Sequence, residues 1–155
     1  MTQQRPGVGE IWLVRHDQGP DVSVLIIEVH DRHIQVLLCG DEVCSATETD
    51  AVLGPSVTGL PGRLLIHGDV SAPILKGRLS EAVGEIALEV VARIVLRGRG
   101  LDFNSSDLGR GRAILSEDDP RWDWKLEKHK ELRRLRASAR ELGWQMYALG
   151  RTGDR

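Results

Sequence analysis

Within about its first 70 residues the chain has four short runs rich in valine, isoleucine and leucine, with no helical stretch between them. These runs occupy residues 10–14, 23–29, 33–39 and 63–69, and glycine, proline or aspartate punctuates their boundaries. A weaker strand is expected at 51–53, before a turn-rich loop at 54–62. Strands this short and this closely spaced favour a small antiparallel barrel or sandwich. The sequence therefore predicts a mainly β fold followed by C-terminal helices.

The period of the apolar pattern changes after the fourth run. In "SEAVGEIALEVVARIVLRG" (80–98), the apolar residues recur at the i, i+3, i+4 spacing of a helix: Val83, Ile86, Val90, Val91, Ile94 and Val95. We therefore predict a helix that ends at Arg97-Gly98, so that residues 1–97 form the barrel with its terminal helix. Residues 98–118 are dense in glycine, serine, asparagine and aspartate, which is typical of a connector.

The last stretch, 119–150, predicts a long basic amphipathic helix, with Asp119 as N-cap, Pro120 at the first helical position and Gly150 at the end. An apolar seam follows a 3,4,3,4,3 spacing along it: Leu132, Leu135, Ala139, Leu142, Met146 and Leu149. This face must pack on something, and we expect either the chain's own barrel or a second subunit in a homodimer. The tryptophans Trp122, Trp124 and Trp144 would anchor the helix or stack on nucleic-acid bases.

Charge is distributed unevenly along the chain. The net formal charge is −7 over residues 1–120 and +5 over residues 121–155. The basic residues His129, Arg133, Arg136 and Arg140 form a stripe beside the apolar seam. Two explanations stay open, because the stripe would attract the acidic barrel and is also the footprint of a phosphate-binding surface. Under the second explanation, Arg133, Arg136 and Arg140 are the candidate RNA-binding residues.

Composition and motifs exclude several classes of protein. Hydrophobic residues make up 41% and charged residues 28%, as in a soluble globular protein, and no apolar run is long enough to span a bilayer. We therefore expect a cytoplasmic protein without membrane contact. His30, His33, Cys39 and Cys44 have ligand types without the paired spacing of a zinc site, so we expect no metal and no cofactor. The chain has no GxSxG, HExxH or Walker sequence.

The order "GEIWLV", Gly-containing loop, "VSVLII", "HIQVLLC" and finally "KGRLSEAVGEI" resembles the MazF/PemK toxin family. "SATETDAVLGPSVTGLPGRLLIHGD" is similar to the middle segment of actinobacterial members. The resemblance covers roughly residues 7–97. It implies a small SH3-like barrel that is usually a dimer and, in active members, a metal-free endoribonuclease restrained by an antitoxin protein.

The resemblance also implies positions for the active residues. The family commonly has an arginine before a proline at the start of the second strand, where this chain has Asp21 and Val22. A family threonine or serine near the end of the third strand would fall on Ser45 or Thr47. Cleaving RNA without metal needs a base, an acid and a cation for the phosphate charge. Arg15 and His16, just before the loop, supply a cation and a titratable base, so the candidate catalytic residues are Arg15, His16 and Thr47.

Three hypotheses follow. The chain is a MazF/PemK-like endoribonuclease acting on single-stranded RNA, or a non-catalytic barrel that binds RNA or an antitoxin-like protein, or a dimeric interaction protein that uses the heptad helix. Asp21 weakens the first hypothesis, because an aspartate repels the phosphate that the arginine would bind. Whether the chain is an enzyme is left open at this stage.

Overall fold

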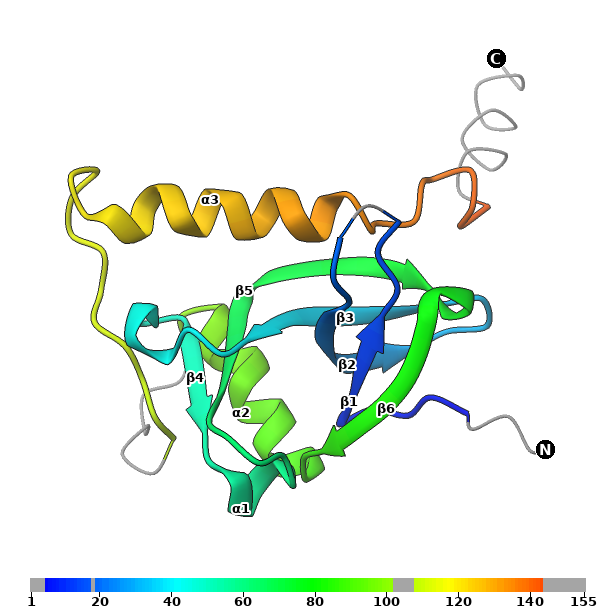
Figure 1. Cartoon of the computed structure of the whole chain (residues 1–155), viewed down its shortest axis with the longest axis horizontal. Coiled ribbons are helices and arrows are strands. Elements are labelled where there is room, and N and C mark those ends of the chain that lie inside the picture. The colour runs from blue at the N-terminus through cyan, green and yellow to red at the C-terminus, as the bar shows by residue number, and fades with distance from the viewer. Residues whose placement is uncertain (1–4, 18, 102–107, 144–155) are drawn as a thin grey trace.

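The computed structural model describes residues 5–17, 19–101 and 108–143 (Figure 1). Within these residues the strands are β1 (Glu10–Val14), β2 (Val22–Val29), β3 (His33–Gly40), β4 (Asp50–Leu53), β5 (Leu64–Leu75) and β6 (Leu79–Glu85). The helices are α1 (Pro55–Thr58), α2 (Leu88–Gly98) and α3 (Pro120–Arg133), and two 3-10 turns are η1 (Val43–Ser45) and η2 (Lys76–Arg78). The five strand runs predicted from the sequence are confirmed, and the fifth continues to Leu75.

The six described strands form one antiparallel sheet in the order β4-β5-β3-β2-β1-β6. The sheet curls strongly, so that its two edge strands approach one another as in a partly open barrel (Figure 1). The long strand β5 pairs with β3 along most of its length and with β4 near its start. The predicted fold class, a small antiparallel barrel with C-terminal helices, is confirmed.

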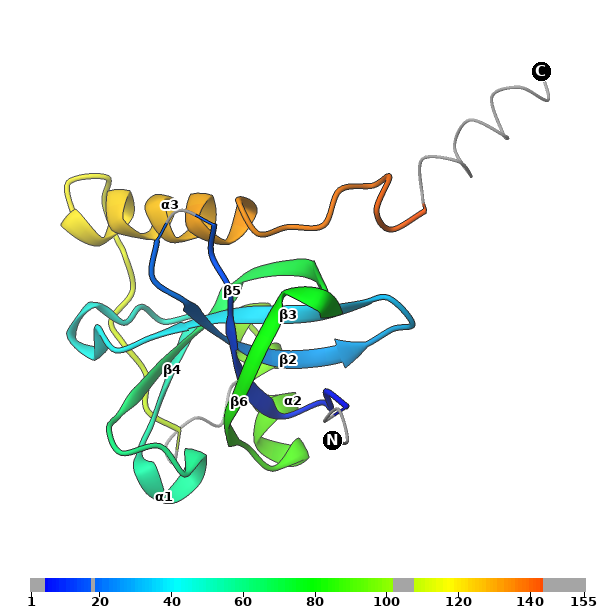
Figure 2. The ribbon, with the colours of Figure 1, turned by 45° about the vertical axis from the view of Figure 1, so that its right-hand side comes forward.

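Each face of the curled sheet has its own core and its own helix. The residues alternate along the strands as a period of two requires, with Ile11, Leu25 and Leu37 on one face and Trp12, Val24 and Val36 on the other. Figure 2 shows α2 against the first of these faces and α3 across the opposite side. The protein therefore has a helix, sheet and helix arrangement in which both sides of the sheet are buried.

The second core is completed by residues at and just beyond the end of α3. Leu132 and Leu135 are 1% and 2% exposed and belong to the same apolar cluster as Trp12 and Val24. The expectation that this face packs on the chain's own barrel is met at these two leucines. Trp124 is half-buried and its indole Nε1 donates a hydrogen bond of 2.9 Å to Glu42, whereas Trp122 is exposed.

The prediction of a single helix over 80–98 was wrong in its first half. Residues up to Glu85 form β6, which pairs with β1, and α2 begins only at Leu88. Apolar residues at Val83 and Ile86 fit both periods, and the β-branched side chain of Val83 suits the strand. Gly84 contributes as well, because a Cβ at this position would lie 2.7 Å from the carbonyl oxygen of Thr58.

The prediction of a continuous helix to Gly150 was wrong over residues 134–143. The predicted start is confirmed, since Asp119 caps α3 and Pro120 is its first residue, but α3 ends at Arg133. The N–H of Ala137 donates to the carbonyl of Pro73 on β5, so the chain leaves the helical path. Ala139 is exposed as a result, and a six-position heptad seam does not form. Met146 and Leu149 lie outside the described residues.

Part of the predicted connector is tied to the sheet. Val52 on β4 forms a β-bridge with Gly109, and Leu108 is buried in the core under α2. The Arg97 side chain, 1% exposed, donates hydrogen bonds to the carbonyl oxygens of Leu108 and Gly109. The division into 1–97, 98–118 and 119–150 stays a prediction. Among the described residues, none of the helices has the length and apolar character that crossing a membrane would require.

Candidate functional site

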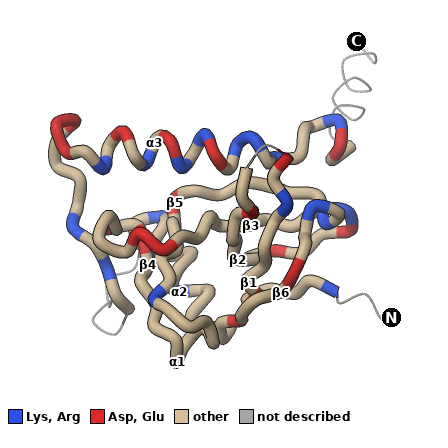
Figure 3. Tube along the Cα trace, viewed as in Figure 1, with Lys and Arg blue, Asp and Glu red and all other residues tan. Residues whose placement is uncertain are grey.

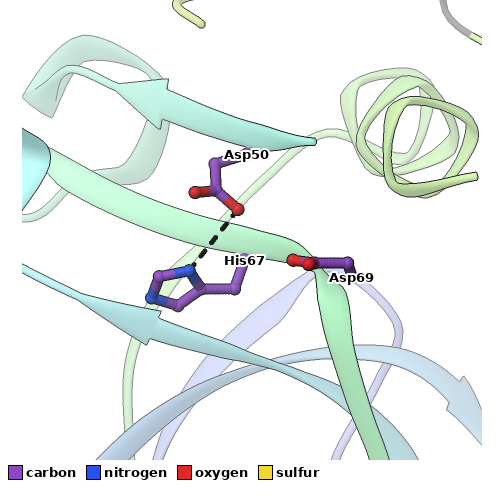
Figure 4. Close-up of side chains that lie close together, drawn as sticks. All are labelled: Asp50, His67 and Asp69. Atoms are coloured by element: carbon purple, nitrogen blue, oxygen red, sulfur yellow. Dashed lines mark ion pairs between the residues drawn. The ribbon is translucent and has the colours of Figure 1, made fainter. Parts of the chain in front are cut away.

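A buried cluster of charged groups lies where β4, β5 and α3 meet. Asp50 is the first residue of β4, and His67 faces it from the paired position on β5 (Figure 4). Their side chains are 0% and 1% exposed, with His67 Nδ1 3.4 Å from Asp50 Oδ1. The ammonium group of Lys125, on α3, contacts Asp50 and lies 2.8 Å from His67 Nδ1. It also lies 2.8 Å from Oδ1 of Asp69, two residues further along β5. We call Asp50, His67, Asp69 and Lys125 the buried centre.

The buried centre holds Asp50 in its charged form. Burial opposes ionisation, but the contact with His67 and the positive charge of Lys125 outweigh it, so the pKa of Asp50 is lowered from its ordinary value. The other carboxylate oxygen, Oδ2, accepts hydrogen bonds of 2.8 Å from the N–H of Thr47 and 3.1 Å from its hydroxyl. A buried carboxylate with this many donors is a fixed charge rather than a group that exchanges protons at neutral pH.

Asp50, His67 and Asp69 have the ligand types of a metal site. One ligand atom from each lies within 4.8 Å of the others, and this is the single such group found among the described residues. The ammonium of Lys125 is in contact with all three side chains and takes the position that an ion would need. The donor set therefore does not fit a resident metal in this protein. His30, His33, Cys39 and Cys44 do not form such a group, and Cys39 is buried while Cys44 is exposed.

Arg15 lies at the end of β1, at the opposite end of the sheet from β4. Its guanidinium donates a 2.7 Å hydrogen bond to the carbonyl of Gly77 in η2. Arg15, Lys76 and Glu81 line one open hollow of about 560 Å³, with Trp12 at its base. We call this the Arg15 hollow. Arg15 and Lys76 bring two positive groups to it, and Glu81 brings one carboxylate.

The three predicted catalytic residues do not converge. His16 lines a different hollow of about 270 Å³, formed with Pro20 and with Glu127 of α3. Thr47 is 4% exposed and contributes to a third hollow, beside the buried centre. Asp21 is exposed just before β2, so no cation stands at the position where the family would have one. The catalytic roles of Arg15, His16 and Thr47 stay predictions.

The predicted RNA-binding residues are only partly on one surface. Arg133 and Arg136 line a shallow hollow of about 110 Å³ over β5 together with His129. Arg140 is exposed in the turn beyond the end of α3. Figure 3 shows that acidic and basic residues alternate along α3, so this helix is a mixed rather than a purely basic surface. RNA binding by Arg133, Arg136 and Arg140 stays a prediction.

Sequence reasoning missed the residues of the buried centre. Asp50 and His67 lie in predicted strands, where a charged or titratable residue at a buried position is uncommon. Nothing in the spacing links them to Lys125, which is 75 residues from Asp50. The signal that was available is the position of "HGD" within an apolar run, because polar residues inside a buried strand need partners.

Comparison with known proteins supports the fold. No family model matches the sequence, and no curated protein matches it. Among solved structures, an endoribonuclease in complex with its cognate antitoxin from Mycobacterial species is similar, with a TM-score of 0.52 and 18% identity over 63% of this chain and 97% of that chain. The Mycobacterium tuberculosis toxin MazF-mt6 matches with a TM-score of 0.48 and 20% identity, covering 61% of this chain and 99% of that one. At such identity the likeness shows the fold, so the chain has a MazF-like fold and the predicted resemblance is confirmed at that level.

Proposed function

We propose that this protein is a MazF-fold endoribonuclease that cleaves single-stranded RNA without a metal ion, with the Arg15 hollow as its active centre. The observation that carries the proposal is the convergence of Arg15, Lys76 and Glu81 on one open hollow. The fold supports it, because the matched solved structure is an endoribonuclease. Lys125 supports the metal-free mechanism, because its ammonium occupies the group of residues with metal-ligand types.

The three side chains suit the chemistry of RNA cleavage. The Glu81 carboxylate takes the proton of a ribose 2′-hydroxyl, and the 2′-oxygen attacks the adjacent phosphorus. The bond to the 5′-oxygen breaks, and that oxygen leaves with a proton from the Lys76 ammonium. Arg15 stabilises the negative charge on the phosphate oxygens, because its planar guanidinium matches their geometry. The products are a 2′,3′-cyclic phosphate and a 5′-hydroxyl. His16 and Thr47 take no step in this mechanism.

The experiment is incubation of the purified protein with a mixed pool of single-stranded RNA, with and without a chelator. We expect cleavage in both, and we expect Arg15→Ala to lower the rate roughly 10²-fold or more. Lys76→Ala and Glu81→Gln should also lower the rate. Arg99→Ala is the matched control, because Arg99 is exposed and does not line the hollow. Loss of cleavage on chelation, or full cleavage by Arg15→Ala, would contradict the proposal.

RNA binding without cleavage is the second candidate function. The observation that favours it is Asp21, which is exposed just before β2. In this case the Arg15 hollow still attracts phosphate, but no RNA is cut under any condition. Binding of uncut RNA that weakens on Arg15→Ala would support this second function over the first.

The proposal extends to partners and location. The matched endoribonuclease was solved with its antitoxin, and we propose a protein antitoxin for this chain as well. We also propose a homodimer that acts in the cytoplasm. The mass of the purified protein in solution tests the dimer, and suppression of RNA cleavage by a co-expressed candidate protein tests the antitoxin.

A further inference from the structure

A second hollow lies beside the buried centre, and the mechanism above does not use it. Its volume is about 210 Å³, and it opens between the turn before β4, the start of β5 and the first turns of α3. We call it the Trp122 hollow. The side chains that matter for its chemistry are Thr47, Glu48, Asp69, Trp122, Leu126 and His129.

One wall of the Trp122 hollow is apolar and open to solvent. Trp122 and Leu126 are 43% and 47% exposed and lie four residues apart on α3, so they share one face of the helix. An indole that keeps this much of its surface in water offers a flat face for stacking. Nucleobases are the planar groups that single-stranded RNA would present to it, and every base stacks on an aromatic ring.

The opposite wall is built from hydrogen-bond acceptors. Oδ1 of Asp69 is buried and accepts no hydrogen bond, although Lys125 Nζ lies 2.8 Å from it. We read this contact as an ion pair without hydrogen-bond geometry, because the ammonium also contacts Asp50 and His67. A buried polar atom without a hydrogen bond is uncommon in folded proteins and indicates a missing partner. Oδ2 of Asp69 has His129 Nε2 at 3.8 Å, beyond hydrogen-bond distance.

We propose that the Trp122 hollow binds a guanine base of single-stranded RNA, stacked on Trp122 and hydrogen-bonded to the carboxylate of Asp69. The proposal rests on the proposed function for the class of ligand. Guanine presents an imino and an amino N–H next to each other, which match the two oxygens of one carboxylate. Uracil presents one N–H between two carbonyl oxygens, which a carboxylate repels. Adenine and cytosine each pair an amino group with an acceptor nitrogen, so they fit less well than guanine.

Mononucleotides test the base preference without any cleavage. GMP and IMP differ only by the amino group of the base, and UMP carries the same phosphate, so calorimetric titration with the three isolates the contact with Asp69. We expect GMP to bind roughly 10-fold more tightly than IMP and more tightly still than UMP. Trp122→Ala changes an exposed side chain, and it should remove most of the binding of all three.

Variants at Asp69 test the hydrogen bond itself. Asp69→Asn should remove the advantage of GMP over IMP, whereas Glu117→Gln, at an exposed acidic residue outside the hollow, should leave it unchanged. Circular dichroism checks that each variant is folded. Should Asp69→Asn fail to fold, Trp122→Ala carries the test. Equal affinity for GMP and UMP in the native protein would overturn the proposal.

Oligonucleotides distinguish an RNA base from a free nucleotide. RNA with methylated 2′-hydroxyls cannot be cleaved, so we would compare an all-uridine strand with one that contains a single guanosine. Tighter binding of the guanosine strand supports the proposal, and tight binding of GMP without this difference would show a site for free nucleotide and overturn it. The outcome is independent of catalysis. A guanine preference without cleavage by the native protein would contradict only the mechanism at the Arg15 hollow.

Discussion

The ammonium group of Lys125 on α3 bonds the carboxylate of Asp50 on β4 across 75 residues of sequence, and both side chains are almost fully buried. Asp50 also contacts the second long helix, because Nη1 of Arg97 on α2 donates to its backbone carbonyl at 3.2 Å. One residue of β4 therefore links the helices that cover the two faces of the sheet. Removing either partner of the Asp50–Lys125 pair would leave a buried charge without its counter-charge.

Lys125→Met tests this pair. We expect a loss of unfolding free energy of about 3–5 kcal/mol, because the methionine fills a similar volume but leaves Asp50 charged and buried. Urea unfolding measures it. Lys130→Met is the control, since Lys130 is 58% exposed and pairs with Glu127 on the surface, and it should cost less than about 1 kcal/mol. Similar losses in both variants would show that the buried pair contributes no more than a surface pair.

Acid should weaken the protein through Asp50. Its pKa in the folded chain lies below the ordinary value of 3.8, so the unfolded chain binds a proton more readily. The stabilisation is present above pH 3.8 and is lost as the pH falls through the folded-state value. Urea unfolding at a series of pH values should show this loss in the native protein and less of it in Asp50→Asn. Asp119→Asn is the comparison, because the pKa of Asp119 is also lowered, by Arg121, but at an exposed position. A stability that falls equally in native protein and Asp50→Asn would assign the acid effect to other groups.

How far the sequence predicts this fold depends on whether a pattern is local. The strand runs were found because two faces of a sheet impose a period of two on neighbouring residues. The helix boundary at Glu85 was missed, because Val83 and Ile86 fit a helix and a strand equally well. The break after Arg133 had a local signal. Ser138 and Glu141 form a capping box, each side chain accepting the other's backbone N–H, and this S-x-x-E spacing marks a helix start inside the stretch predicted as one helix.

Leu135→Ala tests whether the segment beyond α3 belongs to the core. Leu135 is 2% exposed in the cluster with Trp12 and Val24, so the cavity should cost about 2–5 kcal/mol of unfolding free energy. Leu115→Ala is the matched control at a side chain that is 91% exposed, and we expect almost no change there. A Leu135→Ala protein as stable as the control would mean that residues 134–143 detach in solution.

Arg97→Lys tests how the segment after α2 is held to the sheet. The guanidinium donates to carbonyl oxygens of Asp50, Leu108 and Gly109 at once, which an ammonium on a single stem does not reproduce. We expect a destabilisation on the order of 3 kcal/mol and faster proteolysis between residues 98 and 118. Arg99→Lys, at an exposed arginine two residues away, should leave both quantities unchanged. Faster cleavage first inside β2 or β3 would point instead to loss of the whole sheet.

The candidate site was less predictable than the fold, for a physical reason. Arg15 was singled out because it lies beside a loop, and the structure places it in an open hollow with Lys76, 61 residues away in sequence. Lys76 and Glu81 carried no signal of their own, since charged residues near turns are common on protein surfaces. Spacing along the chain does not reveal which charges the curl of a sheet brings together. The same limit applies to the buried centre, whose lysine comes from a separate helix.

Asp21→Arg tests the electrostatics of the loop before β2. Asp21 is exposed, and we expect its replacement by arginine to raise affinity for single-stranded RNA roughly 3–10-fold at low salt, with a gain that shrinks as salt is added. RNA with methylated 2′-hydroxyls keeps binding separate from cleavage. Asp31→Arg makes the same charge change at an exposed residue between β2 and β3 and should give a smaller gain. If the two variants gain equally, net charge alone explains the effect, and the loop before β2 does not lie on the path of the RNA. If only Asp21→Arg gains, the aspartate is what weakens phosphate binding in the native protein, and measuring cleavage by the same variant would show whether an arginine at this position also raises the rate.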